Sequence, residues 1–118
     1  MEGLFDNISR NFDGPAKHNE ETYSYFNRSS RIDVSIVREK LNKWFEEYPN
    51  EEKKELKKRF QKDFDPAFYE LFLFQLFKTL GFEIEIHPQI PSSSNRPDFL
   101  IKKGQLEIEI YSEYLQRN

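Results

Sequence analysis

The fold is decided by residues 65–87, DPAFYELFLFQLFKTLGFEIEIH, in which the spacing of the apolar side chains changes from helical to alternating. Asp65 and Pro66 are typical of a helix start, and Gly81 of a helix end. Nearly every position between them is apolar, which predicts a long helix that is covered on most sides. Apolar and polar residues then alternate over residues 82–87, which predicts a strand with one apolar face.

Two further strands are predicted after a loop over residues 88–96. The first begins at Pro97 and ends at Lys102, and the second covers residues 105–111. Lys103-Gly104 between them is the signal of a tight hairpin turn. We therefore predict an α+β fold, in which N-terminal helices precede a long buried helix and a three-stranded, mostly antiparallel sheet.

The N-terminal half has two parts. Residues 1–30 show no sustained period and are predicted to form an irregular arm. Residues 31–64 predict two amphipathic helices, one from Asp33 to Tyr48 and one from Glu51 to about Lys62. Together with residues 65–118 they should form one compact domain. Three aromatic side chains are expected to hold the arm against the body: Tyr23, Tyr25 and Phe26.

The composition excludes several classes of protein. Twelve Phe among 118 residues are too many for a fully disordered chain. The most apolar run, Leu71 to Phe77, is far shorter than the roughly 20 residues of a membrane span. The start lacks the pattern of a secretion signal and there are no cysteines, so we expect a cytoplasmic protein without a membrane partner.

The net charge is -3, which argues against nucleic-acid binding by bulk attraction alone. The second predicted helix nevertheless has a basic surface, which consists of Lys53, Lys54, Lys57, Lys58, Arg59 and Lys62. These side chains could contact phosphates. Glu51 and Glu55 precede several of them by three or four positions, however, which is the pattern of an ordinary solvated helix and the interpretation that we favour.

Glu70 is a carboxylate within the most apolar segment of the chain. One interpretation places it on a narrow exposed strip of the helix with Lys78, or pairs it with a cation. The other directs it into a polar site, since a buried carboxylate is costly without a metal or a hydrogen-bond donor. His87 could bind metal near such a site, but a single His before Pro88 is more often a surface or turn residue, and we favour that interpretation.

The predicted hairpin sets two acids face to face. If Lys103-Gly104 forms the two-residue loop, opposed residues have numbers that sum to 207 and the apolar faces coincide. Asp98 then lies across from Glu109, with Cβ atoms roughly 4.5 to 5.5 Å apart. Their repulsion would be offset by a divalent cation, by a shared proton, or by basic side chains from residues 53–62.

A helix with Glu70, a hairpin opened by Pro97-Asp98 and Glu109 on the returning strand resemble the core of the PD-(D/E)xK nuclease superfamily, the restriction-endonuclease-like fold. The resemblance covers residues 66–111, and a bacterial group that shares this core is similar over a longer run. It implies that Asp98 and Glu109 bind Mg²⁺ or Mn²⁺, with Glu70 as an auxiliary ligand. The implied activity is hydrolysis of DNA phosphodiester bonds.

The chain departs from the superfamily pattern in two respects. Tyr111 occupies the position of the motif lysine, and Lys78 and Lys102 are the candidates for a relocated one. The usual core also continues into a further helix and strand, so we expect a truncated core that a second copy or a further protein segment completes.

Three functions therefore stay open. The first is a magnesium-dependent DNA endonuclease with a degenerate active site. The second is an inactive nuclease-fold domain that serves as a protein-interaction or DNA-docking module in a larger bacterial assembly. The third is a structural domain in which Asp98 and Glu109 lie on a solvated sheet face.

Overall fold

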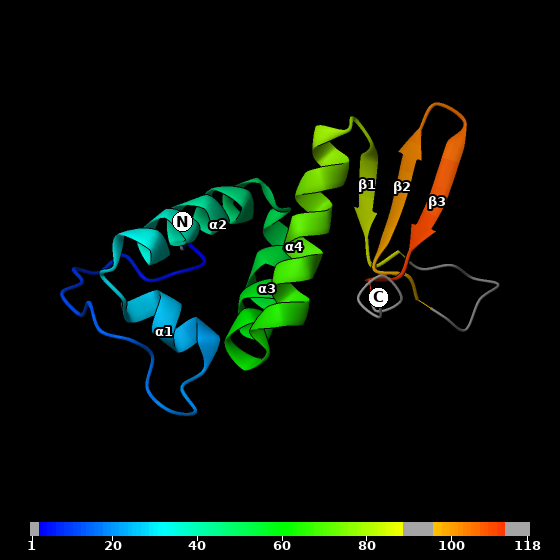
Figure 1. Cartoon of the computed structure of the whole chain (residues 1–118). Coiled ribbons are helices and arrows are strands. Elements are labelled where there is room, and N and C mark those ends of the chain that lie inside the picture. The colour runs from blue at the N-terminus through cyan, green and yellow to red at the C-terminus, as the bar shows by residue number, and fades with distance from the viewer. Residues whose placement is uncertain (1–2, 89–95, 113–118) are drawn as a thin grey trace. The chain divides into compact units, whose positions relative to one another are not determined.

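A computed structural model describes residues 3–88 and 96–112 of this chain (Figure 1). Within these residues it has four helices and a three-stranded antiparallel sheet, which confirms the predicted α+β class. Most of the loop predicted over residues 88–96 lies outside the described residues. The chain divides into two compact units, residues 1–68 and 69–118, and each is described by itself below.

The first unit contains α1 (Thr22–Arg28), α2 (Ile32–Glu47) and α3 (Asn50–Lys62). The prediction of a wholly irregular arm is wrong for α1, a helix too short for its periodicity to stand out in the sequence. Within the arm, the ring of Tyr23 stacks on that of Phe5 at 5.2 Å between centroids, and its hydroxyl donates to the carbonyl of Leu4 at 2.7 Å. Phe26 joins the arm to the body, because its ring lies 5.4 Å from that of Phe64.

The core of the first unit consists of apolar side chains from all three helices and the arm. The most deeply buried are Leu4, Leu41, Phe45, Leu56 and Phe60. The predicted apolar face of α2 is only partly covered, because Ile36 and Val37 are 61% and 39% exposed. The apolar residues of α2 extend more than halfway round the helix, so one flank reaches solvent while the opposite flank is buried.

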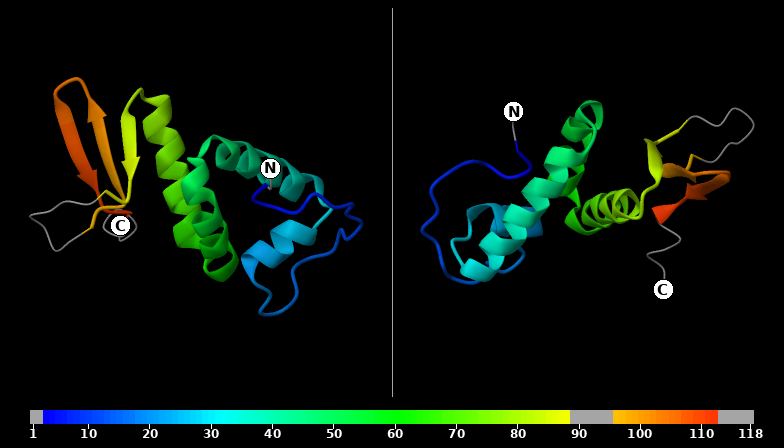
Figure 2. Two further views of the ribbon diagram at one scale, coloured as in Figure 1. Left: turned by 180° about the vertical axis from the view of Figure 1, so that it is seen from behind. Right: turned by 90° about the horizontal axis from the view of Figure 1, so that it is seen from above.

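The second unit contains α4 (Phe64–Thr79) from residue 69 onward and the whole sheet (Figure 2). The strands β1 (Glu83–Ile86), β2 (Phe99–Lys103) and β3 (Leu106–Ile110) lie in the order β1-β2-β3, and both pairs are antiparallel. The ring of Phe74 on α4 lies 6.5 Å from that of Phe99 on the central strand. Both side chains are buried, so this contact joins the helix to the sheet.

The helix α4 is less completely covered than predicted. Leu71, Leu73 and Phe74 are buried, but a strip on another face is more than one third exposed. That strip contains Phe72 and Leu76, and Leu80, which directly follows the helix, is exposed as well. None of the described helices is both long and apolar enough to cross a lipid bilayer.

The predicted register of the β2–β3 hairpin is wrong by two residues. Phe99 pairs with Ile110 and Ile101 with Ile108, so paired numbers sum to 209 and the loop is Gly104-Gln105. Gly104 has a φ of +60°, which suits the first central position of a type II′ hairpin turn. A slip of two residues keeps every side chain on the same face, so the apolar pattern could not exclude it.

Candidate metal site

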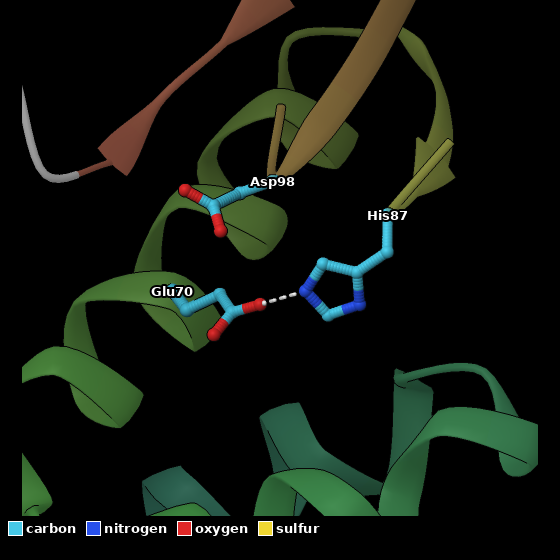
Figure 3. Close-up of side chains that lie close together, drawn as sticks. All are labelled: Glu70, His87 and Asp98. Carbon is cyan, nitrogen blue, oxygen red and sulfur yellow. Dashed lines mark ion pairs between the residues drawn. The ribbon is translucent and has the colours of Figure 1, made fainter. Parts of the chain in front are cut away.

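Three side chains of the second unit converge where α4 passes the ends of β1 and β2 (Figure 3). They are Glu70 of α4, His87 just after β1 and Asp98 just before β2. Their carboxylate and imidazole ligand atoms all lie within 4.8 Å of one another. This is the arrangement that can hold a divalent cation.

Glu70 is the buried member of the group. Its side chain is 5% exposed, and its Oε1 lies 3.0 Å from the Nε2 of His87. The interpretation that placed Glu70 on an exposed strip with Lys78 is therefore wrong, although both residues belong to α4. A carboxylate this deeply buried needs a charged or hydrogen-bonding neighbour, and the imidazole of His87 is close enough to pair with it when protonated.

The backbone of His87 explains why its side chain reaches Glu70. Regular alternation would place His87 on the outer face of the sheet with Glu83 and Glu85. His87 instead has a φ of +48°, in the left-handed region that non-glycine residues rarely adopt. Its N–H donates to the carbonyl of Asp98 at 2.8 Å, and its own carbonyl accepts from the guanidinium of Arg96 at 3.1 Å. These bonds hold the conformation that turns the imidazole toward α4.

Asp98 also departs from strand alternation, because it lies in a bend directly before β2. Its N–H donates to the carbonyl of Ile110 at 2.8 Å, which anchors the bend to β3. Its Oδ2 accepts from the backbone N–H of Ser112 at 2.8 Å and from the Ser112 hydroxyl at 2.6 Å. Asp98 therefore connects the start of β2 to the end of β3, and its carboxylate also points toward Glu70 (Figure 3).

Glu109 does not belong to the group around Glu70. It pairs with Leu100 in the ladder, on the face of the sheet opposite the buried Phe99, and it is exposed. Its Oε1 accepts from the hydroxyl of Tyr111 at 2.8 Å. The expected juxtaposition of Asp98 and Glu109 is thus wrong, for two reasons. The register places Leu100 across from Glu109, and the bend turns Asp98 toward the helix.

Neither of the lysines predicted to replace the motif lysine projects from the region of Glu70. Lys102 is exposed and alternates with the buried Ile101, so it projects from the outer face of the sheet. Lys78 is exposed, and it follows Glu70 by two turns of α4, about 12 Å along the axis.

The acidic outer face of the sheet has its own counter-charge. Lys102 pairs with Glu83 on one side and with Glu107 on the other. Opposite charges across neighbouring strands stabilise a sheet, while like charges destabilise it. Lys102 therefore offsets part of the repulsion among the glutamates of this face, and a metal cation is not needed there.

The donor set of Glu70, His87 and Asp98 fits a divalent cation. An ion with bonds of about 2.1 Å holds any two ligand atoms no more than about 4.2 Å apart. Atoms within 4.8 Å of one another can reach that spacing by small side-chain rotations. Two carboxylates suit Mg²⁺ and Mn²⁺, whereas an imidazole suits transition metals, so the mixed set favours Mn²⁺ over Mg²⁺.

His87 is the residue that the sequence interpretation considered as a metal ligand and set aside in favour of a surface or turn role. A signal for it exists, since the β1–β2 ladder pairs residues whose numbers sum to 185, and this sum places His87 across from Asp98. Pairing the apolar positions of the first two strands would have set the two residues side by side. Their turn toward Glu70 depends on backbone angles at the strand ends, which no periodicity encodes.

No protein-family model, curated protein or solved structure matches this chain. The function is therefore inferred from the chemistry of Glu70, His87 and Asp98 and from the surfaces of each unit.

Proposed function

We propose that the chain is a metal-dependent DNA phosphodiester hydrolase of the PD-(D/E)xK type with a degenerate active site. The observation that carries this proposal is the convergence of Glu70, His87 and Asp98 on one point. Glu70 and Asp98 are two of the three acids that the resemblance to the superfamily implies as ligands. A cysteine-free chain suits the cytoplasm, where its substrate would be met.

The three residues would hold one divalent cation, either Mn²⁺ or Mg²⁺. A bound divalent cation polarises a phosphate oxygen and lowers the pKa of its water. Glu70 would fix the ion from the buried side, since its side chain is 5% exposed. His87 is 28% exposed, so its imidazole is the more accessible of the two side chains to a substrate.

Ser112 would orient the ligand Asp98. Its N–H and hydroxyl both donate to Oδ2, which leaves Oδ1 to face the cation. Hydrogen bonds of this kind position ligands and tune the affinity of a metal site. The left-handed backbone of His87 has the same consequence, because it sets the direction of the imidazole before any ion binds.

A second candidate function is an inactive nuclease-fold domain that docks DNA or protein. The residue at the motif-lysine position favours it, since the hydroxyl of Tyr111 donates to Glu109 and offers no cation. The exposed apolar residues of β3 favour it as well. Leu106 and Ile108 are 53% and 37% exposed, so a second copy or a further protein segment could cover this edge.

Metal binding is tested by the unfolding of the intact chain in the presence and absence of Mn²⁺. At a Mn²⁺ concentration 100-fold above its Kd, the free energy of unfolding should rise by about 2.7 kcal/mol. Glu70→Gln keeps the size of the side chain and removes the charge, so its affinity should be at least 100-fold weaker. Its gain at the same concentration would be about 0.4 kcal/mol.

Glu109→Gln is the matched control, because Glu109 lies on the outer face of the sheet and outside the group. It should respond to Mn²⁺ as the wild type does. An equal response of wild type and Glu70→Gln would refute the metal site.

Hydrolysis is tested separately with plasmid DNA and Mn²⁺. Nicking that is lost in Glu70→Gln and kept in Glu109→Gln would support the hydrolase. Metal binding without nicking would leave the docking domain as the function.

A further inference from the structure

A groove in the first unit is lined by basic and neutral polar side chains of α3. Its volume is about 670 Å³. The lining residues of α3 recur at intervals of three and four positions, so they occupy one face of the helix over about three turns. They are Asn50, Lys53, Lys54, Lys57, Lys58 and Gln61, and Phe45 of α2 completes the lining.

Two of these four lysines are held in place by backbone carbonyl groups. The Nζ of Lys53 donates to the carbonyl of Glu46 at 3.0 Å, and it lies 5.9 Å from the ring centroid of Phe45. The Nζ of Lys57 donates to the carbonyl of Gly3, also at 3.0 Å. Part of the side-chain entropy that a ligand would otherwise remove is therefore already lost.

The acidic residues of α3 lie away from the groove. Glu51, Glu52 and Glu55 are interleaved with the lysines in sequence, but among the described residues that line the groove none is acidic. The helix therefore separates its charges between faces. A chain with a net charge of -3 presents a local concentration of positive charge here.

The apolar side of α3 rules out a membrane surface as the preferred occupant. Helices that lie on membranes insert their apolar face among the lipids. Leu56 and Phe60, which form the apolar stripe of α3, are both 0% exposed because they belong to the core of the first unit. Only the polar face of the helix is available to a partner.

We propose that the groove of α3 binds the phosphate backbone of duplex DNA. Lys54 and Lys58 are exposed and one helical turn apart, so they would contact the phosphates. Lys53 is 8% exposed and Lys57 is half-buried, so these two add positive charge to the groove without being its main contacts. The amide groups of Asn50 and Gln61 at the two ends of the row can donate to further phosphate oxygens. The identification of DNA as the ligand rests on the proposed function. The groove would supply phosphate contacts separate from the metal ligands.

Fluorescence anisotropy of a labelled 20-base-pair duplex with the full chain in EDTA tests this groove without the metal site. If Lys54 and Lys58 contact phosphates, affinity should fall about 12-fold between 50 and 200 mM salt. The double variant Lys54→Gln/Lys58→Gln removes both contacts, so its affinity should be weaker and should change little over the same range. Lys54→Arg/Lys58→Arg should restore the wild-type salt dependence.

The control is Lys40→Gln/Lys43→Gln, which removes the same charge from exposed positions of α2. It should keep the wild-type affinity and salt dependence. Equal losses in the two glutamine variants, or a salt dependence unchanged by Lys54→Gln/Lys58→Gln, would refute the groove. Stronger binding to phosphatidylserine vesicles than to the duplex would also refute it.

The experiments test the DNA-binding groove and the metal site independently of each other. Glu70→Gln should bind the duplex in EDTA as the wild type does, and Lys54→Gln/Lys58→Gln should keep its stabilisation by Mn²⁺. DNA binding by a chain that Mn²⁺ does not stabilise would support the groove and remove the hydrolase.

Discussion

Replacing Ser112 by Ala should destabilise the chain even in the absence of metal, because its hydroxyl donates to the Oδ2 of Asp98 at 2.6 Å. Ser112 is only 9% exposed. The substitution removes one hydrogen bond to a charged acceptor and leaves the second, from the backbone N–H of Ser112 at 2.8 Å. Ser112→Ala thus measures how firmly Asp98 is held, apart from any ion.

The magnitude follows from the two contacts. A hydrogen bond to a charged group contributes about 1.5 to 3 kcal/mol, and partial exposure of Asp98 favours the lower end. We expect Ser112→Ala to lower the free energy of unfolding by about 1.5 kcal/mol. Asp98→Ala removes both acceptor contacts and leaves two donors of Ser112 unpaired, so its cost should be about 3 kcal/mol. The double variant should cost about the same as Asp98→Ala, which gives a coupling energy of about 1.5 kcal/mol.

Urea unfolding of the wild type, both single variants and the double variant in EDTA provides the four free energies of the cycle. The cycle is then repeated with Mn²⁺. If Ser112 orients Asp98 as a ligand, Ser112→Ala should weaken Mn²⁺ binding by about 10-fold or more.

A coupling energy below about 0.5 kcal/mol would contradict this reasoning, because the two residues would then act independently. Additive losses would mean that Asp98 stabilises the fold through other contacts. An unchanged Mn²⁺ affinity in Ser112→Ala, alongside a large coupling energy, would limit Ser112 to a role in stability.

Three further predictions concern the two units. Phe99→Ala, at a position 0% exposed on the central strand, should lower the free energy of unfolding by about 3 to 5 kcal/mol in urea titrations, whereas a loss below 1 kcal/mol would refute its place in the core. Gly104→Ala should cost about 1 kcal/mol in the same assay, because its φ of +60° strains any residue with a Cβ; no loss would contradict the turn. The ion pair with Arg28 lowers the pKa of Glu20 from 4.5 to about 2, so the pair stabilises the fold above pH 4.5 and this contribution is lost as the pH falls toward 2. Glu20→Gln should therefore be less stable than the wild type at pH 6, and the difference should shrink toward pH 2 in thermal unfolding; a difference independent of pH would refute it.

The sequence alone predicted the helices and strands whose apolar side chains recur at a regular spacing. Residues 65–81 can remove most of their apolar side chains from water only as a helix that is covered on most sides. The alternation after Gly81 indicates strands with one apolar face. The α+β class and the face on which each strand residue lies both followed from this. Glu70 could also be singled out, because a carboxylate within an apolar helix needs a partner. Asp98 was singled out by its expected position across from Glu109, which is wrong.

Tertiary structure alone decided the register and the members of the candidate site. Alternation has a period of two, so it cannot distinguish the predicted hairpin from one shifted by two residues, and the left-handed Gly104 selects the second. Glu109 was thereby separated from Asp98. The left-handed backbone of His87 is held by hydrogen bonds with Asp98 and Arg96, and the bend at Asp98 by a hydrogen bond with Ile110, and these partners lie 9 to 12 residues away in sequence. Local sequence therefore determined which face each regular strand residue occupies, and long-range hydrogen bonds decided the two exceptions that bring His87 and Asp98 to Glu70.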